Sequence, residues 1–121
     1  MQFQQHNTPN LPTIESYHSG SITIDGKTYN HPILLHQQIE PLPENWQPEQ
    51  LNFSDFQAAI NNQAQIIIIG TGEKQQFLHP KLVAQLTQAG VGIESMSTDS
   101  ACRTIMLLQS EGRRVWAWLK P

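Results

Sequence analysis

Four consecutive isoleucines, Ile66 to Ile69, constrain the fold of this chain more than any other feature. They lie in segment 64–70, where apolar residues do not alternate regularly with polar ones. β-branched residues favour strands, and a strand that is apolar on both faces must be covered on both. The segment therefore predicts a strand at the centre of a sheet, with helices packed on each side.

The rest of the second half alternates predicted helices and strands. A helix is expected to begin at Pro80 and to end at Gly90, because proline is favoured at the first helical position and glycine just past the last. A strand over 91–96, a helix over 98–109 and a last strand over 113–119 follow. This alternation favours a mainly parallel sheet with right-handed crossovers.

The first half adds a hairpin and one helix. Ile22 and Ile24 alternate with polar residues ahead of Asp25-Gly26, which is typical of a hairpin turn with positive φ at both central residues. Ser54 and Gln57 fit a capping box, so a helix is expected to begin there. Together the elements predict one compact three-layer α/β domain over 14–121. Its central sheet is mixed and mostly parallel, with helices on its faces and an N-terminal β-hairpin.

Residues 1–13 are expected to form a flexible tail, because they are polar and contain two prolines. The first residues have neither a basic start nor an apolar stretch, so neither a secretory signal nor a transit peptide is expected. The longest apolar run is far shorter than the roughly 20 residues that span a bilayer. The chain is therefore expected to be cytoplasmic, without direct insertion into a membrane.

Charge and residue types exclude several function classes. The net charge is -3, and no run of Lys or Arg is longer than Arg113-Arg114, so nucleic acid is not an expected partner. The five histidines lack the spacing of metal ligands. No Ser/His/Asp arrangement stands out either, so no metal, cofactor or catalytic set is predicted.

Four motifs in the second half have a familiar order and spacing. They are Ile-Gly-Thr-Gly at 69–72, Gly-Val-Gly-Ile-Glu-Ser-Met at 90–96, Thr-Asp-Ser-Ala-Cys-Arg-Thr at 98–104 and Glu-Gly-Arg-Arg-Val at 111–115. Together they resemble a family of small domains of unknown function that occurs in bacteria and archaea. The family includes the mitochondrial assembly factor three of respiratory complex I and the adipogenesis-associated eukaryotic protein.

The resemblance covers about residues 14–120 and is to a bacterial member. It implies a compact three-layer α/β fold, no established enzymatic activity and, for the mitochondrial branch, an accessory role in assembling a membrane complex. Ile105-Met106 stands where the family usually has Tyr-Asn, so any chemistry of that pair is absent here.

Trp116 and Trp118 stand where small residues are typical of the family, on one face of the last predicted strand. Trp is enriched at interface hot spots, so both are candidates for contact with a protein partner or a second copy of the chain. The alternative is that they pack under a helix of the same chain.

A crevice at the carboxyl ends of two strands is the candidate ligand site, because ligands gather there in open α/β sheets. Its loops carry Gly70, Thr71, Gly72 and Lys74, then Thr98, Asp99, Ser100 and Arg103. Free N–H groups at the helix start, which Thr98 or Asp99 would cap, can hold a carboxylate or phosphate with Arg103. In the alternative interpretation the glycines only permit a turn, Asp99 only caps and Arg103 only pairs with an acid.

Cys102 lies in the first turn of the same helix, where the helix dipole and Arg103 would lower its pKa. It is therefore a candidate reactive thiol, although a lone cysteine is more often a small buried hydrophobe. A single cysteine cannot close an intramolecular disulfide and fits a reducing compartment.

Two functional hypotheses result. The first is a non-enzymatic accessory or assembly-type protein that acts through protein contacts, with subunits of a membrane complex as partners. The second is a small anionic ligand-binding protein or enzyme that uses the crevice between loops 70–74 and 98–103.

Overall fold

The computed structural model describes residues 11–121. The tail predicted over 1–13 therefore lies mostly outside the described residues. Of its last three residues, Pro12 is buried, and the carbonyl of Thr13 accepts a hydrogen bond from the Asp25 N–H at 3.1 Å. The chain thus enters the N-terminal sheet directly after Thr13.

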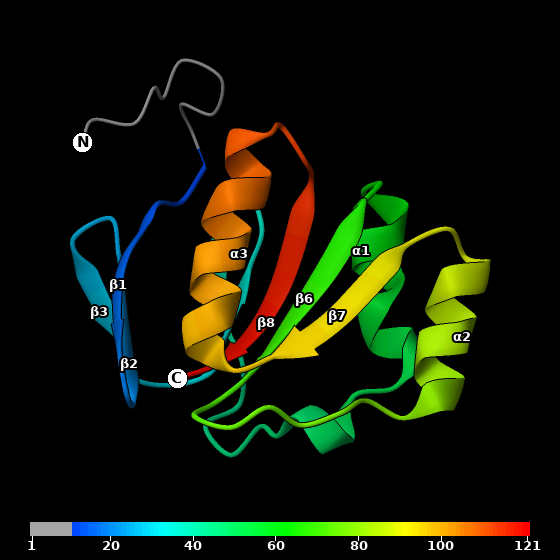
Figure 1. Ribbon diagram of the computed structural model, residues 1–121, viewed down its shortest axis with the longest axis horizontal. Coiled ribbons are helices and arrows are strands. Elements are labelled where there is room, and N and C mark those ends of the chain that lie inside the picture. Colours follow the sequence, from blue (N-terminus) through cyan, green and yellow to red (C-terminus); the bar gives the residue numbers. More distant parts are fainter. Residues whose placement is uncertain (1–10) are drawn as a thin grey trace.

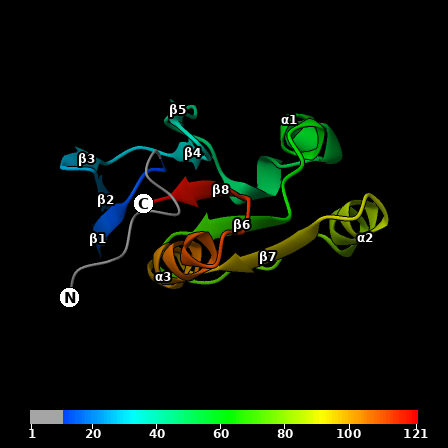
Figure 2. The same ribbon diagram turned by 90° about the horizontal axis from the view of Figure 1, so that it is seen from above.

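A five-stranded sheet forms the middle layer of the molecule (Figures 1 and 2). Its strands, in spatial order, are β5 (Ile39–Pro41), β4 (Ile33–Leu35), β8 (Val115–Lys120), β6 (Ile66–Thr71) and β7 (Gly92–Met96). β6 pairs in parallel with both β7 and β8, whereas β4 is antiparallel to β8 and β5. The isoleucine run is an interior strand as predicted, but β8 takes the middle position because the hairpin β4–β5 extends the sheet beyond it.

Helices cover both faces of this sheet, which confirms the predicted layers (Figure 2). α3 (Thr98–Ser110) lies on one face, and α1 (Gln57–Asn61) and α2 (Pro80–Gln88) contribute to the core on the other. α2 begins at Pro80 and is followed by Gly90 at a φ of 82°, as predicted. Gly112 ends α3 at a φ of 78°.

The predicted capping box at Ser54 is wrong by two residues. Asn52 is the N-cap of the 3₁₀ helix η2 (Phe53–Phe56), and its side chain accepts a hydrogen bond from the Ser54 N–H at 3.1 Å. The Asp55 carboxylate accepts one from the Asn52 N–H at 2.8 Å, and α1 continues from η2. Asn caps helices as well as Ser does, so the earlier pair of residues takes this role. A second 3₁₀ helix, η1 (Pro48–Gln50), lies in the preceding loop.

The N-terminal segment forms a separate antiparallel sheet of β1 (Ile14–His18), β2 (Ser21–Ile24) and β3 (Lys27–Tyr29). Asp25 and Gly26 have φ of 49° and 81°, so they make the predicted hairpin turn between β2 and β3. β1 adds a third strand to the hairpin. The sheet lies beside α3 in Figure 1.

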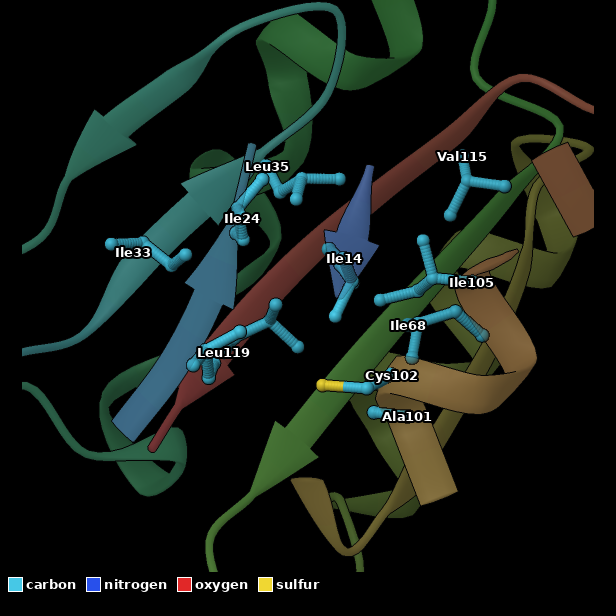
Figure 3. Close-up of a cluster of buried hydrophobic side chains, with 12 residues drawn as sticks. Ile14, Ile24, Ile33, Leu35, Ile68, Ala101, Cys102, Ile105, Val115 and Leu119 are labelled. Atoms are coloured by element: carbon cyan, nitrogen blue, oxygen red, sulfur yellow. The ribbon is translucent and has the colours of Figure 1, made fainter. Parts of the chain in front are cut away.

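The alternation of side chains along β6 and β8 divides the core in two. Ile68, Ala117 and Leu119 face α3 and the N-terminal sheet, where Ile14 and Ile24 join them (Figure 3). On the opposite face Ile67, Ile69, Trp116 and Trp118 pack with residues of η2, α1 and α2. Both faces of β6 are therefore buried against apolar side chains, as the isoleucine run predicted.

Candidate functional site

The two loops of the predicted crevice meet, but the side chain of Thr98 fills the space between them. Thr98 is fully buried, and its Oγ1 accepts a hydrogen bond from the Gly72 N–H at 2.8 Å and donates one to the Lys120 carbonyl. The Thr98 N–H donates to the Gly72 carbonyl, also at 2.8 Å. The Gly72 and Thr98 backbone groups, which belong to the predicted site, therefore bond to this chain instead of to a ligand.

The space around the Cα atom of Gly70 is closely packed as well. A Cβ atom at this position would lie 2.8 Å from Leu119 Cδ2, closer than such atoms approach in proteins, and 3.0 Å from Thr98 Oγ1, a tight contact. The neighbouring Thr71 is buried, and its hydroxyl lies within 2.6 Å of the Lys74 carbonyl. The glycine permits close packing of β6 against α3, and this role accounts for it without a ligand.

Ser97, not Thr98 or Asp99, is the N-cap of α3, and its Oγ accepts a hydrogen bond from the Ser100 N–H. The Asp99 carboxylate instead pairs with Arg103 at 2.8 Å, and both side chains are mostly exposed. Arg103 also donates to Ser100 Oγ at 3.3 Å. The pairing of Arg103 with an acid agrees with the alternative interpretation of these residues.

Cys102 is buried in the core beneath α3 (Figure 3). Burial raises the pKa of the thiol to about 12; the Asp99 carboxylate adds to this shift, and Arg103 opposes it. The burial and the raised pKa favour the alternative interpretation of Cys102 as a small buried hydrophobe. Desolvation thus outweighs the effect of the Arg103 charge, which would lower the pKa.

Trp116 and Trp118 are 9% and 4% exposed, so they do not form an exposed association patch. Trp118 packs edge to face against Phe56 at a centroid distance of 4.8 Å, and Trp116 stacks on His36 at 4.1 Å. The burial of both indoles agrees with the intramolecular alternative. The face of β8 that carries both indoles is covered by the chain's own segments.

A cavity of about 500 Å³ lies at the opposite end of the sheet from the predicted crevice, where β8 begins. Five segments of the chain line it: Leu11 ahead of β1, the β4–β5 hairpin, α1 with its C-cap, the last turn of α3, and the turn that leads into the start of β8. Their polar residues are His36, Gln37, Gln38, Glu40, Asn62, Gln109, Arg113 and Arg114. The Glu-Gly-Arg-Arg-Val motif at 111–115 contributes four of the lining residues, but the sequence analysis did not interpret it as a site.

His36 is the least exposed titratable group of the cavity, at 8%. Its Nε2 lies 2.5 Å from a Glu40 carboxylate oxygen, and its ring lies nearly parallel to the Trp116 indole, at 8°. The pair arises because the tight hairpin, in which Leu35 lies opposite Ile39, brings residues 36 and 40 together. Arg114 is fixed as well, since its Nε donates to the Gln63 carbonyl at 2.8 Å.

Two further hollows lie on the surface. One, of about 400 Å³, is lined by residues of β1 and α3, among them Tyr17, whose hydroxyl is buried and has no hydrogen-bond partner within residues 11–121. Burial raises the pKa of Tyr17, and Glu73 adds to the shift. The other, of about 420 Å³, adjoins Phe77, a side chain that is 86% exposed.

The part of the chain described here contains no group of three or more His, Cys, Asp or Glu placed to hold a metal ion. Nor does any helix between residues 11 and 121 have the length and apolar character that crossing a membrane requires.

Comparison with known proteins confirms the resemblance predicted from the four motifs. A family model described as a protein of unknown function (DUF498/DUF598) matches residues 14–120. The 13 kDa major membrane protein of Francisella tularensis subsp. holarctica is 31% identical over 103 residues, which cover 84% of each chain. A Bordetella parapertussis protein of known crystal structure is 32% identical, with a TM-score of 0.80 over 92% of this chain and 96% of its own.

The name of one mouse relative of this chain states a role for that relative. NADH dehydrogenase (ubiquinone) 1 alpha subcomplex assembly factor 3 of Mus musculus is 32% identical over 120 residues. The match covers 97% of this chain but 64% of the mouse protein, so the chain spans less than two thirds of that relative's length.

Proposed function

The chain belongs to the DUF498/DUF598 family, which includes complex I assembly factors, and on that basis we propose that it is a non-enzymatic accessory protein in the assembly of a membrane complex. The observation that carries the proposal is the match to the mouse assembly factor along 97% of this chain. The whole described fold is therefore the part shared with that relative. The proposal rests on this sequence match, because one fold can serve many functions and a shared fold does not identify a role.

An accessory protein of this kind needs a surface for its partner, and Phe77 is the best candidate. It is 86% exposed, the most exposed of the large apolar side chains in residues 11–121. Aromatic residues are enriched at the centres of protein interfaces. The hollow beside Phe77 is lined by Pro48, Leu51 and Leu78, among others, so an apolar side chain of a partner can pack against both.

The loop that carries Phe77 is held in place on each side. The Gln75 side chain donates a hydrogen bond to the Ser95 carbonyl at 2.9 Å, and the Gln76 N–H donates to Thr71 Oγ1 at 3.1 Å. After Phe77, the His79 imidazole caps α2 through the Lys81 N–H at 3.1 Å. A fixed loop loses little conformational entropy on binding, which favours a preformed contact surface.

Phe77→Ala is expected to lower the capture of partner subunits at least about tenfold, because truncation of a central aromatic commonly costs 2 kcal/mol or more of binding energy. The tagged protein would be expressed at its native level and recovered with detergent-solubilised membranes, and bound proteins would be identified by mass spectrometry. Leu107→Ala is the matched control, since Leu107 is 59% exposed on another surface. It should capture the same proteins as the parent.

Two outcomes would count against this proposal in different ways. If the folded parent protein reproducibly captures no subunit of a membrane complex, the assembly role is wrong. If Phe77→Ala captures as much as Leu107→Ala, the role stands and the Phe77 surface is wrong. The cytoplasmic location and a homo-oligomeric state remain predictions.

A further inference from the structure

We propose that the cavity at the start of β8 binds a small metabolite through an oxyanion group, a carboxylate or a phosphate, with Arg113 and Arg114 as the anion-binding residues. This inference goes beyond the assembly role and does not rest on it. The cavity volume of about 500 Å³ lies within the range of roughly 300–1,000 Å³ that is usual for small-molecule sites.

The charges that line the cavity favour an anion. Arg113 and Arg114 contribute two guanidinium groups, whereas the lining includes one carboxylate, that of Glu40. That carboxylate is already engaged by His36 Nε2 at 2.5 Å. The cavity therefore has an excess of positive charge, although the chain as a whole is negative.

One of the two arginines is already oriented. Arg114 uses its Nε to donate to the Gln63 carbonyl at 2.8 Å, and its backbone N–H donates to Gln65 Oε1. These bonds hold the side chain in place and leave its terminal Nη groups for a ligand. Paired guanidinium N–H groups match the oxygens of a carboxylate or phosphate and give short, strong hydrogen bonds.

The end of α3 faces the same cavity, and its carbonyls would repel an anion if they were free. The chain caps them: the Gly112 N–H donates to the Gln109 carbonyl at 2.9 Å, and the Arg113 N–H donates to the Leu108 carbonyl at 3.0 Å. The main-chain turn that places Arg113 at the cavity thus also offsets the partial negative charge of the last carbonyls of α3.

The remaining walls suit a polar, uncharged portion of the ligand. Gln109, which is only 5% exposed, and Asn62 both line the cavity and carry side-chain amides. The stacked rings of His36 and Trp116 form a flat wall held by the Glu40 contact. Aromatic side chains combined with polar groups that can orient a ligand are typical of ligand pockets.

The test is a titration of the full chain with inorganic phosphate and, separately, with citrate, at constant ionic strength. The ring signals of His36 and the indole N–H signal of Trp116 would be followed by NMR. Saturable shifts of these signals are expected with at least one anion. A response to phosphate alone identifies a phosphate-bearing ligand, and a response to citrate alone identifies a carboxylate-bearing one.

Arg113→Ala should raise the Kd for the responding anion at least tenfold, and Arg113→Ala/Arg114→Ala should abolish the saturable shifts. Arg103→Ala is the matched control, because it removes an exposed arginine at the other end of α3 and should leave the Kd unchanged. Both Arg113 and Arg114 are exposed, so the variants should fold, and their amide spectra check this. The proposal is overturned if neither anion gives saturable shifts, or if the Arg113 variants bind as tightly as Arg103→Ala.

Discussion

Trp118→Ala should lower the free energy of unfolding by about 3–5 kcal/mol, the usual cost of truncating a buried tryptophan. Trp118 is 4% exposed, lies on the middle strand of the sheet and packs edge to face against Phe56. The truncation would remove a large apolar surface from the core beneath α1 and leave a void that the neighbouring strands cannot close. Urea denaturation followed by circular dichroism measures this loss.

Phe77→Ala is the control for Trp118, because it truncates an aromatic that is 86% exposed and should change stability by less than about 0.5 kcal/mol. If both variants were equally stable, Trp118 would not be part of the core. The two indoles would then again be candidates for a partner interface.

Thr98→Val should lower the free energy of unfolding by about 2–4 kcal/mol, although the two side chains have nearly the same shape. The substitution leaves the buried Gly72 N–H and the partly buried Lys120 carbonyl without the hydroxyl of the fully buried Thr98. An unsatisfied buried polar group costs roughly 1–3 kcal/mol. The loss would be measured by the same urea denaturation.

Thr87→Val provides the matched control for Thr98. The Thr87 hydroxyl is exposed and donates only to the Val83 carbonyl of its own helix, at 2.9 Å. Water can replace that bond, so the change in stability should stay within about 0.5 kcal/mol. A Thr98 variant as stable as the Thr87 variant would mean that the two loops are not joined through this hydroxyl, and the crevice would again be a candidate ligand site.

Features set by a few neighbouring residues were predictable from the sequence. Pro80 and Gly90 bound α2, and Asp25-Gly26 makes its turn, because the backbone preferences of these residues act locally. The order of the strands was not predictable in the same way. β8 lies in the middle of the sheet because β4, which is distant in sequence, pairs with its outer side.

The functional site was harder to predict than the fold, for two physical reasons. Small hydroxyl residues such as Thr71 and Thr98 are typical of ligand loops, but here their hydroxyls bond to the chain's own backbone. The residues of the observed cavity, such as His36, Gln109 and Arg113, come from separate segments and meet only in the folded chain. The spacing of residues along the sequence therefore does not predict that these side chains line one cavity.

The two proposed surfaces lie at opposite ends of the sheet, so they can be tested separately. The Phe77 loop follows the carboxyl end of β6, which runs parallel to β8 (Figure 1). The cavity lies at the other end of these strands, where β8 begins. A variant in one surface should therefore leave the other intact.

The most direct test of the assembly role is the amount of mature NADH dehydrogenase in cells from which the gene has been deleted. Membranes would be solubilised in mild detergent and separated on a native gel, and subunits would be detected by mass spectrometry. Loss of the mature complex and accumulation of partial assemblies are expected, with rescue by the parent protein but not by Phe77→Ala. A normal amount of mature complex in the deletion strain would contradict the role.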